Sequence, residues 1–541
     1  MRKAVLGLLI TTLLVSSVFS GCVEKSEKTA AGDGEKYTIT VGYPKADETW
    51  EDDEYFNYIT DKVGIDIDFQ AISADSATEK ARIWISSGSM PDIVYSDFLM
   101  DEYIKYGEQG VVRALPSDWE KNYPNLGFSM AMTGMLSELK RVGDGEIYGL
   151  LRPMDYYAEF LDEFRSAYNE GRDLEAMMQD PKYKYIDQYG FAYRKDWAEQ
   201  LGIETDYIME YDDFMDMAKK FKEADLGKVG AKSAVGIAVD YTEAPNIFIT
   251  AFNSSYKYFH KDDSGKYVCG LTEDTTTEGV KAYAEAFRTG ILAPDFYTQK
   301  TQDLNSLFCS QRAGIIFPKA ETSGLRRLKS EFAKANPGID PDEAIGVCWI
   351  LSPDGKVHGR ESINYNGGFY FNPEISDDKF AKILELADYV SSPEGGPQVR
   401  LGVPGVDYDE NYNIIREKNE TGVWDSLDKK YPSYEFFRFF VNPQYNQLQD
   451  DVDPAARAES NALQAAKRTK ELSLKKIDIA GETYTADDFV KFNAAYEVNS
   501  MFAEIIVSDG DVEVEWNKKR AEIAKAAKSV EENMNKALLG K

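Results

Sequence analysis

The sequence predicts an α/β protein, because strand-like and helix-like patterns alternate along its first hundred residues. Apolar and polar residues alternate over 37–42, and again at Ile65, Ile67 and Phe69, as they do in half-buried strands. A helix-compatible segment follows each of these strands, and a short apolar run at 93–95 comes after the second helix. Strand, helix, strand, helix, strand at this spacing favours a parallel sheet with crossover helices.

Length and composition indicate two or more domains with sizeable cores. The chain has 541 residues, of which 43% are hydrophobic and 13% aromatic. Its formal net charge is −31, and the sequence contains no basic stripe that could bind phosphate. Such a surface repels phosphate backbones, so nucleic acid is not an expected partner.

Three later segments carry the apolar spacing of amphipathic helices. They are 214–221, 380–390 and a long stretch over 514–538 that places Trp516, Ile523 and Met534 on one face. These apolar faces are most simply core faces. Turn signals at 262–265 and 353–355 lie between strand-like runs and predict hairpin loops.

The N-terminus is typical of an exported protein. Arg2 and Lys3 precede an apolar run over 4–15, which is the layout of a secretory signal peptide, predicted here as residues 1–21. Phe19-Ser20-Gly21-Cys22 resembles the lipobox of bacterial lipoproteins, in which the cysteine is lipidated and becomes the mature N-terminus. In residues 22–36, Cys22 then carries the lipid, including palmitate, and the residues after it form a flexible tether. The alternative is an ordinary signal peptide with an incidental cysteine.

Sequence motifs for catalysis or cofactors are not found. The chain has no metalloprotease, nucleophile-elbow, phosphate-loop or dinucleotide motif, so we expect no catalytic residue, cofactor or metal site. His260 and His358 lie in polar, turn-rich contexts that favour exposed loops. Beyond Cys22 three cysteines remain, which allow at most one disulfide, and the sequence does not say which: Cys269, Cys309 and Cys348.

Several segments, taken together and in order, resemble family 1 extracellular solute-binding proteins, the capture components of ABC importers. "WISSGSMPDIVYSD" at 84–97 resembles the family's helix-to-strand signature, in which Gly88 ends a helix and Pro91 prevents its return. "FAYRKDWAEQLGI" at 191–203 matches the pattern of the long, lipoprotein-type oligosaccharide binders. The other matching segments are 111–126, 144–153, "FRTGILAPDF" with "FCSQRAGIIF", and 391–408.

The resemblance implies a two-lobed periplasmic-binding-protein-like fold (type II), with an interlobe cleft and hinge strands. Lobe 1 is predicted as 38–152 plus 365–415, and lobe 2, mostly helical, as 153–364 plus 416–541. Residues 154–190 look like an insertion between two family motifs. Where relatives carry a calcium loop, this chain after Asp225 lacks the carboxylates that calcium needs, which does not favour a structural calcium.

The resemblance further implies a ligand held between the lobes and captured by hinge closure. Sugars offer apolar ring faces edged by hydroxyls, which aromatic, carboxylate and amide groups bind. The predicted ligand contacts are Trp50, Ser96, Asp97, Arg152, Arg194, Asp196, Phe317, Trp349, Tyr365, Asn366 and Tyr370. For Arg152, Arg194 and Asp196, a role in fixing the hinge is an equal alternative, and for each aromatic residue the alternative is core packing.

The implied function is a lipid-anchored receptor that captures a carbohydrate, expected to be an oligosaccharide, outside the cell membrane or in the periplasm if the host has two membranes. It would act as a monomer and deliver the sugar to ABC permease subunits. One alternative is the same role with a peptide or another small polar solute. The other is a surface glycoside hydrolase with a carboxylate pair.

Overall fold

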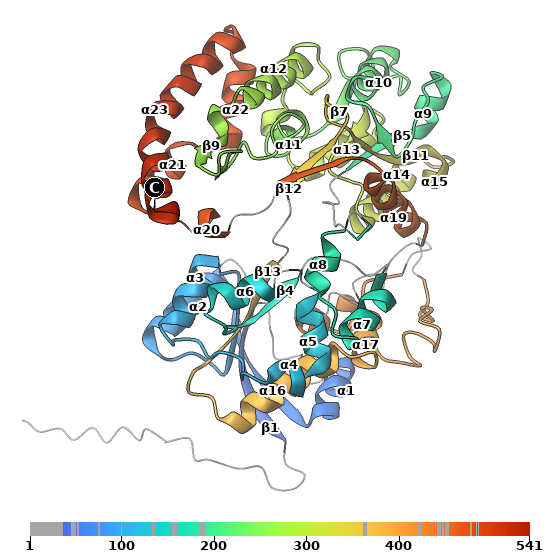
Figure 1. Cartoon of the computed structure of the whole chain (residues 1–541). Coiled ribbons are helices and arrows are strands. Elements are labelled where there is room, and N and C mark those ends of the chain that lie inside the picture. The colour runs from blue at the N-terminus through green and yellow to red at the C-terminus, as the bar shows by residue number, and fades with distance from the viewer. Residues whose placement is uncertain are drawn as a thin grey trace, which may run out of the picture.

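The protein consists of two lobes, each built around a five-stranded sheet (Figure 1). The computed structural model describes residues 36–540 except 45–49, 51–52, 74–75, 99, 133, 135, 154–159, 181, 184–189, 361–364, 419–423, 439, 441–444, 446–447, 449–453, 476–478, 483 and 485. The predicted signal peptide, Cys22 and the tether up to residue 35 therefore lie outside the described residues.

The first sheet has the strand order β2-β1-β3-β13-β4. Strands β1, β2 and β3 are parallel, as the sequence predicts, whereas β13 runs antiparallel to both β3 and β4. The carboxyl ends of four strands and the amino end of β13 consequently share one edge. The strands are β1 (Tyr37–Pro44), β2 (Ile65–Ile72), β3 (Ile93–Ser96), β4 (Leu150–Pro153) and β13 (Tyr365–Phe371).

The second sheet has the order β6-β11-β5-β10-β7, with β5 antiparallel to both of its neighbours. The carboxyl ends of β6, β7, β10 and β11 therefore meet the amino end of β5 at one edge. The strands are β5 (Phe191–Arg194), β6 (Ile208–Met209), β7 (Val235–Ala238), β10 (Ala313–Ile316) and β11 (Ile345–Ile350). Two small ribbons pair β8 (Phe259–Lys261) with β9 (Tyr267–Cys269), and β12 (Val357–Arg360) with β14 (Leu472–Lys475).

Helices cover both sheets, and some of their ends show simple capping chemistry. Asp53 accepts hydrogen bonds from the first free backbone N–H groups of α1, and Gly88, at φ 66°, ends α2 in the left-handed conformation. The helices of the first lobe are α1 (Glu54–Val63), α2 (Ala77–Ser87), α3 (Met100–Glu108), α4 (Trp119–Asn122), α5 (Pro124–Ala131), α6 (Leu136–Val142), α7 (Leu161–Asn169), α8 (Leu174–Met178), α16 (Asp377–Val390), α17 (Gly395–Leu401) and α18 (Tyr434–Arg438).

The second lobe is richer in helix and ends in one long helix, α23, which packs on α12, α21 and α22 (Figure 1). Its helices are α9 (Lys195–Gln200), α10 (Tyr211–Ala224), α11 (Ala244–Phe248), α12 (Asp274–Arg288), α13 (Thr301–Cys309), α14 (Thr322–Ala335), α15 (Pro341–Ala344), α19 (Pro454–Arg468), α20 (Ile479–Glu482), α21 (Asp487–Ala495), α22 (Val498–Val507) and α23 (Val512–Leu539). The predicted helices around 214–221, 380–390 and 514–538 are confirmed as α10, α16 and α23.

Two separate hydrophobic cores correct the predicted lobe boundaries. The first core includes residues of α7 and α8, as well as Leu427, Tyr434 and Phe440, all of which were predicted to belong to lobe 2. Aromatic packing explains the difference, since Tyr168 of α7 lies against Phe128 of α5 at 5.4 Å between ring centroids. The chain therefore passes from one lobe to the other between Tyr183 and Phe191, between Arg360 and Tyr365, and between Tyr445 and Pro454. The described part of the insertion at 154–190 packs mainly on the first lobe.

The two predicted hairpins have different outcomes. The turn at 262–265 joins the antiparallel strands β8 and β9, as predicted. The turn at 353–355 forms, with Gly355 N donating to Ser352 O at 2.8 Å, but it does not make a hairpin. Strand β12 instead pairs in parallel with β14, more than a hundred residues later in the chain. A local turn signal does not specify which strand becomes the partner.

The three cysteines of the globular part are free and buried, in different elements. Burial raises the pKa of Cys269 and of Cys309 to about 12, and raises that of Cys348 as well. Thiolates are the reactive form, so all three thiols are protonated and shielded at neutral pH. Within the described part of the chain, no helix combines the length and the apolarity that crossing a membrane requires.

We expect a thiol reagent at pH 8 to leave Cys269, Cys309 and Cys348 unmodified in the native protein and to modify all three after unfolding in guanidinium chloride. Mass spectrometry of the labelled peptides measures this directly, and Cys22 is counted separately. Rapid labelling of any of the three in native buffer would contradict the burial described here.

Candidate functional site

The shared edge of the first sheet carries a polar cluster, which we call the first-lobe edge. It consists of Tyr95, Asp97, Arg152 and Gly367. Asp97 comes directly after β3 and is exposed, whereas Arg152, near the end of strand β4, is half-buried. The strand order brings these side chains together because β13 lies between β3 and β4 and runs in the opposite direction.

A hydrogen bond holds the carboxylate of this edge in place. The Tyr95 hydroxyl donates to Asp97 Oδ1 at 3.1 Å. Burial of the ring and the nearby Asp97 charge raise the pKa of Tyr95, so its hydroxyl stays protonated and remains a donor. Gly367 has a φ of 69°, and a Cβ there would overlap Asp97 Oδ1 and the Tyr95 hydroxyl. Only glycine fits at this position, for its conformation and for its size.

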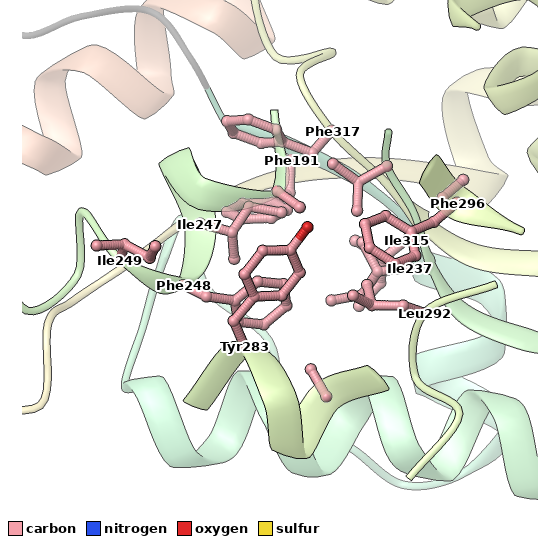
Figure 2. Packing of buried hydrophobic residues seen from close by; sticks show 14 of the residues in the cluster. Phe191, Ile237, Ile247, Phe248, Ile249, Tyr283, Leu292, Phe296, Ile315 and Phe317 are labelled. Atoms are coloured by element: carbon pink, nitrogen blue, oxygen red, sulfur yellow. The ribbon is translucent and has the colours of Figure 1, made fainter. Parts of the chain in front are cut away.

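The second lobe has a small pocket at its own shared edge, partly open to solvent. Its apolar wall comes from Phe191 at the start of β5 and Phe317 just after β10, whose ring centroids are 4.8 Å apart. Figure 2 shows these two rings beside Ile247 of α11. The remaining lining residues are Asn246, Thr250, Ala251, Trp349, Ile350, Ser352 and His358.

Trp349, near the end of β11, supplies the third aromatic side chain of the pocket. Its Nε1 atom is buried and has no hydrogen-bond partner among the residues that the structure describes. A buried N–H without an acceptor is costly, so a ligand oxygen at this position would satisfy it. His358 lies on the rim, with Nε2 2.8 Å from Asp354 Oδ2.

The pocket can bind a ligand that has both apolar faces and polar edges. Phe191, Phe317 and Trp349 provide aromatic surface, and amide, hydroxyl and imidazole groups surround it: Asn246, Thr250, Ser352 and His358. Asn246 is oriented by a hydrogen bond from its Nδ2 to Glu243 Oε2 at 2.8 Å. Aromatic surface with a few oriented polar groups is the usual composition of small-molecule sites.

The first-lobe edge and the pocket lie near the junction of the lobes. His358 belongs to β12, which ends at Arg360, and the chain re-enters the first sheet at Tyr365. Five Cα–Cα steps separate these two residues, so their Cα atoms are at most about 19 Å apart. Figure 1 shows β12 and β13 at the sides of their lobes that face each other.

The structure brings some of the predicted site residues together. Phe317 and Trp349 line one pocket, and Asp97 and Arg152 share the first-lobe edge, where Tyr365 and Asn366 begin β13. Ser96 ends β3 at the same edge but is fully buried. The function of all these residues in ligand binding remains a prediction.

Other predicted site residues belong to cores. Trp50 is only 4% exposed and packs on Phe69 at 4.9 Å between centroids, which leaves a ligand little of its ring to contact. Tyr370 is fully buried and packs on Phe98 at 4.8 Å. For these two residues the structure favours the core-packing alternative, because β13 turns Tyr370 inward and the first core closes over Trp50.

Arg194 and Asp196 lie at the opposite edge of the second sheet from the pocket. Strand β5 begins at Phe191 in the pocket and ends at Arg194. The Arg194 guanidinium donates hydrogen bonds to both carboxylate oxygens of Asp196, at 2.7 and 2.6 Å. Arg194 is 1% exposed and its guanidinium stacks on Trp197 and Phe332. This geometry favours a structural role over ligand contact.

Sequence reasoning identified only two residues of the pocket lining, Phe317 and Trp349. The aromatic and polar residues that it missed are Phe191, Asn246, Thr250, Ser352 and His358. Phe191 begins a strand that the family motif at 191–203 had already located, so its position at a strand end could have identified it. Ser352 follows β11, a strand that none of the quoted motifs covers. Asn246, Thr250 and His358 carry no such signal, since the pocket is assembled from distant segments.

The described residues contain no group of three or more acidic, cysteine or histidine side chains that could hold a metal ion. At the loop after α10, Asp225 accepts hydrogen bonds from the backbone N–H groups of Val229 and Gly230 at 2.9 and 2.8 Å. The carboxylate at this position therefore closes the loop through protein contacts.

Comparisons with known proteins agree with this architecture. Residues 149–397 match the family described as bacterial extracellular solute-binding protein. No curated protein matches the sequence. Three solved structures of similar fold are the alginate-binding protein AlgQ2 without calcium ion, the S. pneumoniae ABC-transporter substrate-binding protein FusA in complex with kestose, and an extracellular solute-binding protein from Bifidobacterium longum subsp. infantis.

These likenesses extend over nearly the whole chain. AlgQ2 is 17% identical, with a TM-score of 0.57, and the match covers 93% of this chain and 98% of that one. FusA is 16% identical, with a TM-score of 0.59, and the match covers 93% of this chain and 100% of that one. The Bifidobacterium protein is 15% identical, with a TM-score of 0.60, and the match covers 92% of this chain and 97% of that one. At such low identities the likeness establishes the two-lobed fold and nothing finer.

Proposed function

Since residues 149–397 place this chain in the bacterial extracellular solute-binding protein family, we propose that it is the carbohydrate receptor of an ABC importer. The observation that carries the proposal is the pocket of the second lobe, where three aromatic side chains meet amide, hydroxyl and imidazole groups. Similar folds whose structures are described as alginate-binding or in complex with kestose support a sugar as the cargo.

A sugar would bridge the two lobes in this proposal. Its apolar faces would stack on Trp349 and Phe317, and its hydroxyls would donate to Asp97 of the first-lobe edge and accept from Arg152. Contacts to both lobes exist only when the lobes are close together, so the ligand would favour closure. The permease would then recognise the closed form. Cys22 would carry the lipid anchor that holds the receptor, as a monomer, outside the membrane.

The proposal is tested by thermal unfolding of the purified protein with kestose, malto-oligosaccharides, chito-oligosaccharides, uronate oligosaccharides and a mixture of short peptides. A ligand that binds the native state raises the melting temperature by mass action. We expect at least one sugar to raise it and the peptides to leave it unchanged. A shift with peptides alone would support the alternative cargo. Release of new reducing ends from a bound glycan would support a glycoside hydrolase instead.

Replacing Asp97 by alanine is expected to weaken binding of the responding sugar by more than about tenfold, the equivalent of about 1.4 kcal/mol. Asp97 is exposed and accepts one hydrogen bond from Tyr95, so the melting temperature without ligand should change little. Isothermal titration calorimetry measures the affinity. Asp118→Ala, an exposed carboxylate of the same lobe away from this edge, is the matched control. Unchanged affinity in Asp97→Ala would remove the first-lobe edge from the site.

A further inference from the structure

A buried lysine lies over the ring of Trp349, one of the residues that line the pocket. Lys467, in the last turn of α19, is fully buried, and its Nζ atom is 3.8 Å from the centroid of the Trp349 ring. Helix α19 packs along β11, the strand that carries Trp349. This lysine comes from a segment more than a hundred residues away from any other part of the pocket, and it does not itself line the pocket.

The contact constrains the indole ring. The face of an aromatic ring attracts a cation, and the attraction is strongest for tryptophan and for a cation removed from water. An ammonium on one side of the ring therefore holds the ring against rotation about its side-chain bonds. The positive charge also polarises the ring, which strengthens Nε1–H as a donor. That donor is the one that lacks a partner among the described residues.

We propose that Lys467 is a positioning residue for the ligand site: its buried ammonium fixes the Trp349 ring as a wall of the pocket. The inference rests on the proposed function of this pocket. A receptor gains affinity when its contact surfaces are held in the bound geometry beforehand, because less ordering is needed on binding. Lys467 would therefore contribute to sugar affinity without touching the sugar.

The first test needs no ligand. Near-ultraviolet circular dichroism of the wild type minus that of Trp349→Phe isolates the signal of Trp349 in its fixed environment. The spectrum of Lys467→Met minus that of the double variant Lys467→Met/Trp349→Phe gives the Trp349 signal without the cation. This signal should be less than about half of the first one, since the methionine keeps an apolar chain but removes the cation. Lys470→Met, which removes an exposed lysine just after the same helix, should leave the signal unchanged. An unchanged signal in Lys467→Met would overturn the inference.

The second test uses the sugar from the thermal panel. Lys467→Met should weaken its binding by about fivefold or more, and Lys467→Arg, which keeps a cation that stacks on rings, should restore most of the loss. In a Trp349→Ala background the same Lys467→Met change should alter affinity by less than about twofold, because the ring through which it acts is gone. An equal loss in both backgrounds would mean that Lys467 acts through general packing and would overturn the inference.

The two failures are distinguishable. If Trp349→Ala does not change the affinity for any sugar of the panel, the proposed pocket is wrong, whatever Lys467 does to the spectrum. If Trp349→Ala weakens binding and Lys467→Met does not, the pocket stands and the positioning role fails.

Discussion

Replacement of Trp349 by alanine should weaken sugar binding by about thirtyfold, or about 2 kcal/mol, the largest loss that we expect from any single change in this protein. Trp349 lines the same pocket as Phe317 and Phe191 and offers a ring face and a buried Nε1–H, which has no hydrogen-bond partner in the described part of the chain. Removing it takes away the stacking surface and the donor together. Isothermal titration calorimetry with the sugar from the thermal panel gives the affinity, and urea unfolding shows that the fold is retained.

Trp349→Phe separates the two contributions, because phenylalanine keeps an aromatic face and lacks the donor. We expect its affinity to lie between those of the wild type and Trp349→Ala. Tyr297→Ala is the control, since Tyr297 is an aromatic residue of the same lobe that is 44% exposed and lies outside the pocket. Equal affinities for the wild type and Trp349→Ala would place the sugar elsewhere.

Replacement of Arg194 by methionine should lower the free energy of unfolding by about 2 kcal/mol or more and leave sugar affinity within about twofold of the wild type. The guanidinium is buried, bonds Asp196 through two nitrogens and stacks on two aromatic rings. Methionine fills the space of the arginine chain, but it leaves the Asp196 carboxylate without its charged partner and with only the backbone N–H of Trp197 as a donor. The Asp196 side chain is 28% exposed, which limits the loss because water can replace part of the contact.

Urea unfolding of Arg194→Met and of Lys195→Met makes a matched comparison, since each variant removes one cation at adjacent positions and Lys195 is exposed. Arg194→Met should be clearly less stable than the wild type, and Lys195→Met should not. A large loss of sugar affinity in Arg194→Met with unchanged stability would return Arg194 to the ligand site and contradict its placement at the far edge of the sheet.

Local patterns in the sequence were enough to predict many of the elements. The alternation at 37–42, the spacing of Phe214, Met217 and Phe221, and the helix end at Gly88 all reflect contacts between residues close together in the chain. The order of the family motifs likewise predicted the two-lobed architecture. These features need no knowledge of distant partners, because periodicity and capping depend on the segment itself.

Lobe membership depended on tertiary packing. The insertion around α7 and the segment containing Phe436 and Phe440 were assigned to the second lobe, yet both pack in the first core. Phe436 lies 5.2 Å from Tyr43 between ring centroids, although nearly four hundred residues separate them. No local pattern distinguishes an aromatic residue that packs on one lobe from an aromatic residue that packs on the other.

The α/β class, the parallel start of the first sheet, the long terminal helix and the likeness to solute-binding proteins could all be inferred from the sequence. The folded chain was needed to see that Trp50 and Tyr370 are core residues, that Arg194 lies away from the pocket, that His358 lines the pocket with Trp349, and that Lys467 lies over the Trp349 ring. Strand direction and burial are set by pairing between distant segments, and a ligand site is made of the side chains that this pairing brings to one edge.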